Sequence, residues 1–506
     1  MKPKLLFWID QGLFHYGLAK FIQENLDCQM YSIFEVTENE KKFFESQQIV
    51  NFEKSWFFHD NILKQNSALD LEYLEKIEKK YNLDLQLIVF NDRIFYHFNS
   101  YYKFSRNEIL CILQDEIKFF ESILDEIKPD FLIIFETHQQ HNHIFYEICK
   151  ARGIEIIIPV GSRIGINPKS SLKHGSRWYL SDDTDQCLPL PNENNNSINE
   201  IKNNSFTDAK FSHEFQKSTT KYLKAALKYF FTEENNIKTH YSYFGRSKIK
   251  VIFKMLHYEL RKKYRENFME KNLNYEINDK LKIVYFPMHQ EEERILLIGA
   301  PFYTNQFELI RNISNSLPVG YVLAVKDHSV MNVRGWRGVR EVKQIMGLPN
   351  VIMFHHSVDS TELIKKSKLV ISIRGTTSIE AAFYQKPSIV FGKVGMYEIS
   401  TMTIVDSLKN LPKIIKNSLT QKVNEDEIKK YEKTVYENTF EFPMYQIGNA
   451  FEDEFKMGGY YANVKIESEK IIKFLKKYEK ELTFLALKHI EKINNHKKIL
   501  RDSNQN

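Results

Sequence analysis

The sequence predicts an α/β protein with two doubly wound domains and added helices. Short apolar runs rich in β-branched residues alternate with stretches of helical periodicity, which is the pattern of parallel strands joined by helices. This pattern occurs near the amino terminus and again from residue 282 onward. The 506 residues exceed what one ordinary core holds, so the length also indicates two or three domains.

Composition shifts divide the chain into four expected parts. A stretch rich in Asn, Pro and Ser over Cys187–Asn204 is typical of a flexible surface segment. Basic helices over Phe211–Asn272 follow it and precede the second α/β domain. The expected boundaries are 1–185 for the first α/β domain, 186–278 for the flexible segment and basic helices, 279–415 for the second α/β domain, and 416–506 for carboxy-terminal helices.

Charge and cysteine usage narrow the class of protein. The net charge of +6 is small for this length and both signs are interspersed, which argues against a nucleic-acid-binding protein. The four cysteines lie far apart without CxxC spacing, so the sequence indicates neither a zinc site nor a disulfide framework. The histidines do not follow HExxH spacing either, so we expect no metal site. No apolar run is long enough for a signal peptide or a membrane span, so we expect a cytoplasmic protein.

The first domain opens with the apolar run Leu5–Ile9, which predicts a buried strand that ends at Asp10. The periodicity after it predicts a helix, and the strand–helix alternation then continues. The other expected elements are helices over Phe14–Leu26 and Arg106–Ile127, a helix that ends at Ala151, and strands over Met30–Val36, Leu85–Phe90, Phe131–Phe135 and Ile154–Pro159.

Two strand ends of this domain carry candidate catalytic residues. Asp10 follows the first strand, and Glu136 and His138 follow the strand over Phe131–Phe135. Ligands approach a doubly wound sheet at the carboxyl ends of its strands, where a carboxylate or imidazole can transfer protons near neutral pH. Asp10 could instead cap the following helix. Arg163, after the next strand, could hold an acidic group of a substrate or belong to a simple loop.

Strand ends of the second domain bring polar residues to one edge. A strand over Lys282–Pro287 precedes His289. Three successive strands then end in Lys326 with His328, in His355-His356, and in a Gly-Thr-Thr-Ser turn. Because a phosphate needs several donors at once, this convergence predicts an anion site. Further expected elements are a helix over Gln306–Leu317 and a strand over Val351–Phe354.

The turn after the strand Leu369–Ile373 has the densest group of candidate binding residues. Gly375 permits a sharp turn, and a helix is expected to open at Thr376 or Thr377, with Glu380 completing a capping box. Hydroxyls and backbone N–H groups at a helix start can bind a phosphate, although a capped helix without a ligand explains the same pattern. The candidates are Arg374, Gly375, Thr376, Thr377, Ser378 and Glu380.

With these residues in place, the region 281–400 resembles the capsule polysaccharide and surface carbohydrate biosynthesis proteins, a family that includes the Kdo transferases of capsule assembly. The resemblance lies in four pieces: Tyr285–Gln290 with Glu293-Arg294, Leu323–His328, Asp359–Ile364, and Ile373–Ala381 continuing to Lys386-Pro387, Phe391-Gly392 and Tyr397.

The resemblance implies a GT-B architecture, in which two Rossmann-like domains face each other across a cleft, and a metal-independent glycosyltransferase without a cofactor. The second domain would hold a CMP- or UDP-linked sugar donor through His289, Lys326, His328 and the turn, and the cations would neutralise charge on the departing nucleotide. The first domain would hold a glycan or glycolipid acceptor. Asp10 or Glu136, near His138, would act as base or as nucleophile.

Two other functions fit the same architecture. A nucleotide-sugar 2-epimerase would also need phosphate donors and carboxylates, but the acidic run usual before its glutamate helix is replaced here by Arg374-Gly375-Thr376-Thr377. A non-catalytic nucleotide-sugar-binding assembly protein is the third reading. Basic and apolar residues alternate between Lys248 and Arg265, so this helix could contact the inner face of an anionic membrane or simply pack on the protein.

Overall fold

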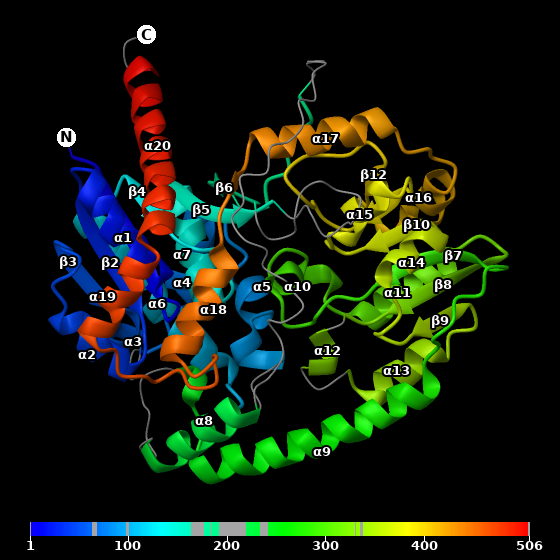
Figure 1. The fold of residues 1–506 in the computed structure, drawn as a ribbon, viewed down its shortest axis with the longest axis horizontal. Coiled ribbons are helices and arrows are strands. Elements are labelled where there is room, and N and C mark those ends of the chain that lie inside the picture. Colours follow the sequence, from blue (N-terminus) through cyan, green and yellow to red (C-terminus); the bar gives the residue numbers. More distant parts are fainter. Residues whose placement is uncertain are drawn as a thin grey trace.

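The computed structural model describes residues 2–62, 68–97, 101–162, 177–183, 185–191, 219–232, 241–328, 330–333 and 337–503. Within these ranges the chain forms two separate β-sheets, each with helices packed on both faces (Figure 1). Most strand pairs are parallel, as expected for strands joined by helical crossovers. The predicted α/β class with two sheets is confirmed.

The N-terminal sheet is buried on both faces. Leu5 and Phe7 point into one hydrophobic cluster, whereas Leu6 and Trp8 point into another on the opposite face. Its strands lie in the order β13 (Phe440–Glu441), β6 (Arg177–Ser181), β5 (Glu155–Gly161), β4 (Phe131–Ile133), β1 (Lys4–Asp10), β2 (Gln29–Glu35) and β3 (Lys54–Phe57), of which β13 and β6 run antiparallel to their neighbours.

The helices of this half agree with the expected pattern at most positions. Ser105 and Glu108 form a capping box at the start of the long helix, whose predicted bounds are confirmed. The predicted strand over Leu85–Phe90 is wrong, because Leu85 and Val89 are buried at helical spacing. The helices are α1 (Phe14–Asn25), α2 (Glu38–Ser46), α3 (Phe58–Ile62), α4 (Leu71–Tyr81), α5 (Leu85–Phe90), α6 (Arg106–Ile127) and α7 (Gln140–Ala151).

The C-terminal sheet is wholly parallel, which brings the carboxyl ends of its strands to one edge. Its order is β12 (Met402–Ile404), β11 (Ser388–Val390), β10 (Ser367–Ser372), β7 (Lys282–Pro287), β8 (Tyr321–Lys326) and β9 (Val351–Phe354). The helices around it are α10 (Arg294–Leu297), α11 (Gln306–Ser316), α12 (Val330–Val333), α13 (Val339–Met346), α14 (Ser360–Lys366), α15 (Thr377–Phe383) and α16 (Leu411–Ser418).

In the described part of the chain, three segments join the half built on the N-terminal sheet to the half built on the C-terminal sheet. The segment after β6 reaches the C-terminal half, where Leu188 pairs with Tyr397. Next come α8 (Thr219–Thr232) and α9 (Lys248–Asn272), and α9 runs along the lower side of the molecule between the two sheets (Figure 1). Beyond α17 (Glu425–Glu437) the chain returns, so α18 (Met444–Phe455), α19 (Ser468–Lys477) and α20 (Glu479–Ser503) pack against the N-terminal sheet.

Candidate functional site

Ser372, the last residue of β10, anchors the turn that precedes α15. Its hydroxyl accepts a hydrogen bond from the Gly375 N–H at 2.9 Å and lies 3.2 Å from Nε2 of His289, which follows β7. A Cβ atom on Gly375 would stand 2.5 Å from this hydroxyl oxygen, so only glycine permits the approach. The structure therefore brings two predicted residues, His289 and Gly375, into one packed turn.

The start of α15 differs from the predicted capping box. Thr376 already has right-handed helical angles, and its hydroxyl donates a hydrogen bond to the Glu380 carboxylate at 3.2 Å. The Thr377–Glu380 box is therefore wrong, because Glu380 lies one helical turn from Thr376 instead. In the described part of the chain, no group accepts a hydrogen bond from the backbone N–H of Thr376 or Thr377. These two N–H groups can therefore donate hydrogen bonds to an anion.

The buried Lys326 and the half-buried Glu380 are groups of opposite charge beside this turn. Lys326, the last residue of β8, is 6% exposed, and its ammonium donates a hydrogen bond to the Val358 carbonyl at 2.7 Å. Burial lowers the pKa of Lys326 to about 8, against the opposing charges of Asp359 and Glu380. Burial raises the pKa of Glu380 to about 7, against Thr376 and Lys326. Such strongly shifted groups gather at functional sites.

Arg337 is a buried cation that the sequence did not reveal. Its guanidinium is 2% exposed, pairs with Asp327 at 3.1 Å and donates a hydrogen bond to the His289 carbonyl at 3.1 Å. These contacts fix the strand ends that carry His289 and Lys326. His328, also a predicted donor-binding residue, has an exposed side chain next to this pair. No motif marks Arg337, because its partners come from separate segments.

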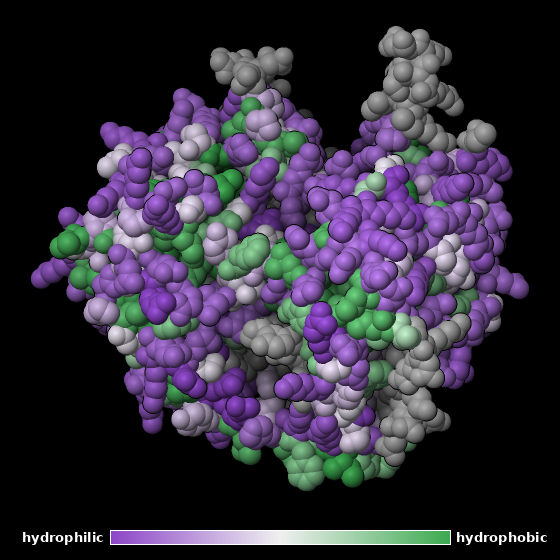
Figure 2. All heavy atoms as spheres, turned by 180° about the vertical axis from the view of Figure 1, so that it is seen from behind, coloured by the Kyte–Doolittle hydropathy of each residue, from purple (hydrophilic) through white to green (hydrophobic). Residues whose placement is uncertain are grey.

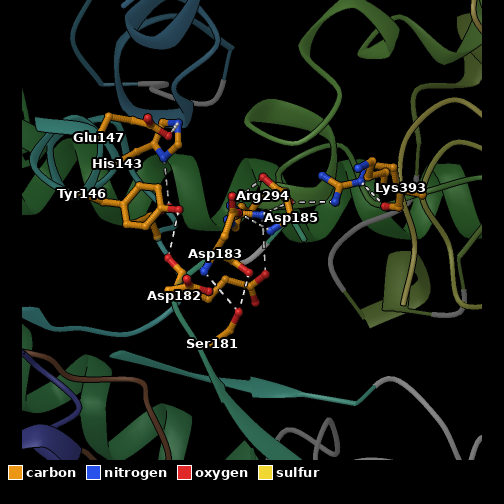
Figure 3. A network of polar contacts seen from close by, with 12 residues as sticks. His143, Tyr146, Glu147, Ser181, Asp182, Asp183, Asp185, Arg294 and Lys393 are labelled. Carbon is orange, nitrogen blue, oxygen red and sulfur yellow. Dashed lines mark hydrogen bonds and ion pairs between the residues drawn. The ribbon is translucent and has the colours of Figure 1, made fainter. Parts of the chain in front are cut away.

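Asp185 joins two buried arginines, Arg294 and Arg374. Figure 3 shows Asp185 beside Arg294. The carboxylate lies 3.1 and 3.2 Å from the Arg294 guanidinium and 2.7 Å from Nη2 of Arg374. Burial opposes ionisation of Asp185, but the two guanidinium groups outweigh it and hold the pKa well below its usual range. Arg374 also donates to the Lys393 carbonyl at 2.9 Å. The Arg374 side chain therefore binds Asp185 and the Lys393 carbonyl, whereas the sequence predicted that it binds a phosphate.

Glu136 reaches the same cluster from the N-terminal half. Its carboxylate lies 3.5 Å from Nη1 of Arg294, so a predicted catalytic carboxylate faces the C-terminal half. His138 has an exposed side chain, and its backbone carbonyl accepts a hydrogen bond from Arg93 at 2.6 Å. A small pocket beside this cluster takes its lining from both halves, including Val160, Gly161, Tyr179, Asp185, Arg374 and Lys393.

Asp10 lies in a different polar group, at the ends of β1 and β2. Its carboxylate accepts a hydrogen bond from the Gly12 N–H at 2.9 Å. Burial and the neighbouring carboxylate of Glu35 raise the pKa of Asp10 to about 6, so this group can exchange a proton near neutral pH. Glu35 itself lies 2.9 Å from Nε2 of His141 and accepts a hydrogen bond from the Trp8 indole at 3.0 Å.

Buried hydrogen bonds extend this group into the domain interior. Nδ1 of His141 lies 3.2 Å from the Tyr241 hydroxyl, which donates to Glu116 at 3.0 Å. Burial raises the pKa of Glu116 to about 7, and Gln140 donates two further bonds to its carboxylate at 2.8 and 2.9 Å. The sequence could not show this network, because Tyr241 and Glu116 are 125 residues apart.

Two further predictions concern an acceptor-binding residue and metal ligands. Arg163, the predicted acceptor-binding residue, lies outside the described residues. Over the described ranges, no three His, Cys, Asp or Glu side chains are arranged to hold a metal ion.

Several solved structures share features of this fold at low identity. UDP-GlcNAc 2-epimerase from Neisseria meningitidis is 12% identical over 86% of this chain and 99% of that one, with a TM-score of 0.22. KpsC, a beta Kdo 2,7 transferase from Thermosulfurimonas dismutans, is 12% identical over 58% and 78%, with a TM-score of 0.26. At such low identities and TM-scores, these similarities do not identify an activity for this chain. No curated protein matches it significantly.

A family model gives the clearer result. Residues 185–436, about half of the chain, match the model described as capsule polysaccharide biosynthesis protein. The matched region contains the whole C-terminal sheet together with Asp185, Lys326 and the turn before α15. This chain therefore belongs to the capsule polysaccharide biosynthesis family.

Proposed function

We propose that this protein is a glycosyltransferase that moves a sugar from a nucleotide-sugar donor to a growing surface polysaccharide or glycolipid. Family membership supports a role in capsule synthesis. The observation that carries the proposal is the group of Lys326, Glu380 and Thr376 at the carboxyl edge of the C-terminal sheet. A buried lysine with a lowered pKa beside unpaired turn amides is an arrangement suited to an anion.

In this proposal the donor phosphate lies on the turn before α15. The Thr376 and Thr377 amides donate to phosphate oxygens, with the Thr377 side chain close by. The predicted Ser378 is fully buried, and its hydroxyl instead donates to the Gly375 carbonyl at 2.7 Å. A bound phosphate favours the ammonium form of Lys326 and so opposes the lowering of its pKa by burial. The same charge stabilises the nucleotide as it departs, which is the main electrostatic demand of the reaction. His289 positions the turn through Ser372.

The acceptor side of the proposed reaction uses carboxylates of the N-terminal half. Glu136 contacts Arg294 of the other half, and Asp10 has a pKa of about 6. Either group could remove the proton of an acceptor hydroxyl or attack the anomeric carbon. We therefore propose residues 1–185 as the acceptor domain and residues 279–415 as the donor domain.

The proposal is tested by asking whether the C-terminal half binds the donor and the N-terminal half supplies the catalytic carboxylate. Thr376→Ala with Thr377→Ala should weaken donor binding, measured as a smaller ligand-induced rise in melting temperature. Glu136→Gln and Asp10→Asn should leave that rise unchanged, while at least one of them stops transfer of labelled sugar to acceptor extracts. Loss of donor binding in both carboxylate variants, with none in the threonine variant, would reverse the assignment.

The product of the same reaction separates the alternatives. A transferase releases free nucleotide only when an acceptor is present. A 2-epimerase instead interconverts the bound sugar without an acceptor, and a non-catalytic protein binds the donor and leaves it unchanged.

A further inference from the structure

The longest helix between the two sheets, α9, presents an apolar stripe to solvent. Five apolar or aromatic residues at spacings of three or four lie on one face of this helix, and each is 59% to 70% exposed to solvent. Large apolar side chains rarely gather in this way on the surface of a soluble monomer. The stripe consists of Ile249, Phe253, Leu256, Leu260 and Tyr264.

The ends of α9 are fixed by contacts that leave the stripe free. Near its start, Lys250 donates a hydrogen bond to the Tyr101 carbonyl at 2.6 Å, and Lys254 lies over the Tyr101 ring at 4.7 Å. Near its end, Met269 is 1% exposed in the core of the C-terminal half, together with Leu273. The helix is thus held on both halves by another face, and packing on its own domains does not explain the stripe.

The end of α8 adds apolar surface next to the start of α9. Phe230 and Phe231 are 46% and 75% exposed, and the Lys248 ammonium donates a hydrogen bond to the Phe230 carbonyl at 2.8 Å. Hydrophobic atoms collect at the lower edge of the molecule in Figure 2, on the side where Figure 1 draws α8 and α9.

Charge determines which partner this surface fits. The α9 sequence contains eight lysines and arginines but only three glutamates. Basic side chains beside an exposed apolar face attract anionic headgroups while the apolar side chains enter the acyl boundary. None of the described helices is long and apolar enough to cross a bilayer. A helix that lies in the plane of the membrane interface uses both its basic and its apolar side chains and does not cross the bilayer.

We propose that α9, with the aromatic end of α8, is a docking surface for an anionic lipid bilayer. Phe253, Leu256 and Leu260 enter the boundary between headgroups and chains, while Arg261 and Lys263 contact acidic headgroups. This inference does not depend on the transferase activity proposed above.

Vesicle cosedimentation of the full-length protein tests the proposal. The wild-type protein should sediment with vesicles of phosphatidylcholine and phosphatidylglycerol, but not with phosphatidylcholine alone, and high salt should release it. The double variant Phe253→Glu with Leu260→Glu should bind the anionic vesicles at least tenfold more weakly. Lys263→Gln should weaken binding roughly fivefold, the effect expected for the loss of one basic charge near such a surface.

A matched control comes from the C-terminal helices. Ile472 of α19 and Leu487 of α20 are each 50% exposed, so Ile472→Glu with Leu487→Glu makes the same chemical change elsewhere. This control should bind anionic vesicles like the wild type. Phe253→Ala with Leu260→Ala repeats the test without new charge, and the melting temperature of each variant verifies folding.

Three outcomes would overturn the proposal. They are no sedimentation of the wild type with anionic vesicles, equal binding to neutral vesicles, and unchanged binding of both α9 double variants. Light scattering measures the oligomeric state and so tests the alternative that a second copy of the chain binds the stripe. If the wild type were a dimer, and the α9 variants became monomers without any change in vesicle binding, the stripe would be a subunit interface instead.

Discussion

At the scale of single residues, the pKa of Glu380 gives a pH-dependent prediction. The folded-state pKa of about 7 lies above the ordinary value of 4.5, so the stability that this group contributes is present below pH 4.5 and lost as pH rises through 7. Relative to Glu380→Gln, the wild type should lose about 3 kcal/mol of unfolding free energy between pH 4.5 and pH 8. Urea unfolding at both pH values measures this. A difference independent of pH would show that the carboxyl is not desolvated.

Gly299 gives a second prediction at this scale. A Cβ atom there would stand 1.8 Å from Nη1 of Arg374, so Gly299→Ala must displace the guanidinium from Asp185. We expect destabilisation of about 1–3 kcal/mol, typical of overpacking. Gly448→Ala is the control, because that exposed glycine of α18 has no neighbouring atom within 4 Å of the added Cβ and alanine favours helix. Equal unfolding free energies for both variants would refute the tight fit.

The sequence predicted single residues well only where one short segment was sufficient. Gly375 and Thr376 follow a buried apolar strand, and the local pattern located the turn correctly. The buried partners that determine pKa or orientation could not be predicted in this way. Asp185 and Arg374 are 189 residues apart, and their pairing depends on how the two halves meet.

At the scale of elements, long periodic segments were predicted best. The 22 residues of α6 carry a capping box and a continuous buried face, and the bounds were correct. The six residues of α5 form an apolar run too short to distinguish helix from strand by periodicity. The edge strand β3 was missed, because its four residues are mostly polar or half-buried.

The carboxy-terminal elements give an element-scale prediction. α18, α19 and α20 supply buried residues such as Phe451, Leu475 and Leu485 to the same cluster as Phe7. Deleting residues 440–506 should therefore expose one face of the N-terminal sheet and abolish cooperative thermal unfolding, with dye binding to the exposed surface. Deleting only residues 499–506 leaves these buried residues in place and should preserve the transition. Cooperative melting of the larger deletion would contradict this packing.

At the scale of the whole molecule, the two halves are connected by segments of the chain that cross between them and by ion pairs between side chains. Glu136 of the N-terminal half meets Arg294 of the C-terminal half, and Asp185 bridges Arg294 and Arg374 between them. These ion pairs hold Glu136 and Asp185 against arginines of the C-terminal half. The repeated strand–helix pattern predicted two α/β halves, and the family resemblance implied that they face each other. No local pattern indicated the ion pairs that join them.

The central claim is that the carboxyl edge of the C-terminal sheet binds the phosphate of a nucleotide sugar, and calorimetric titration tests it most directly. The wild type should bind at least one of the CMP-, UDP- or GDP-sugars, and Lys326→Met should bind it roughly tenfold to a hundredfold more weakly, as expected for loss of a charge-assisted hydrogen bond. Lys366→Met, which removes a lysine paired with Asp279 at the end of α14, should bind like the wild type. No binding to any nucleotide sugar, or equal affinity in Lys326→Met, would contradict the account.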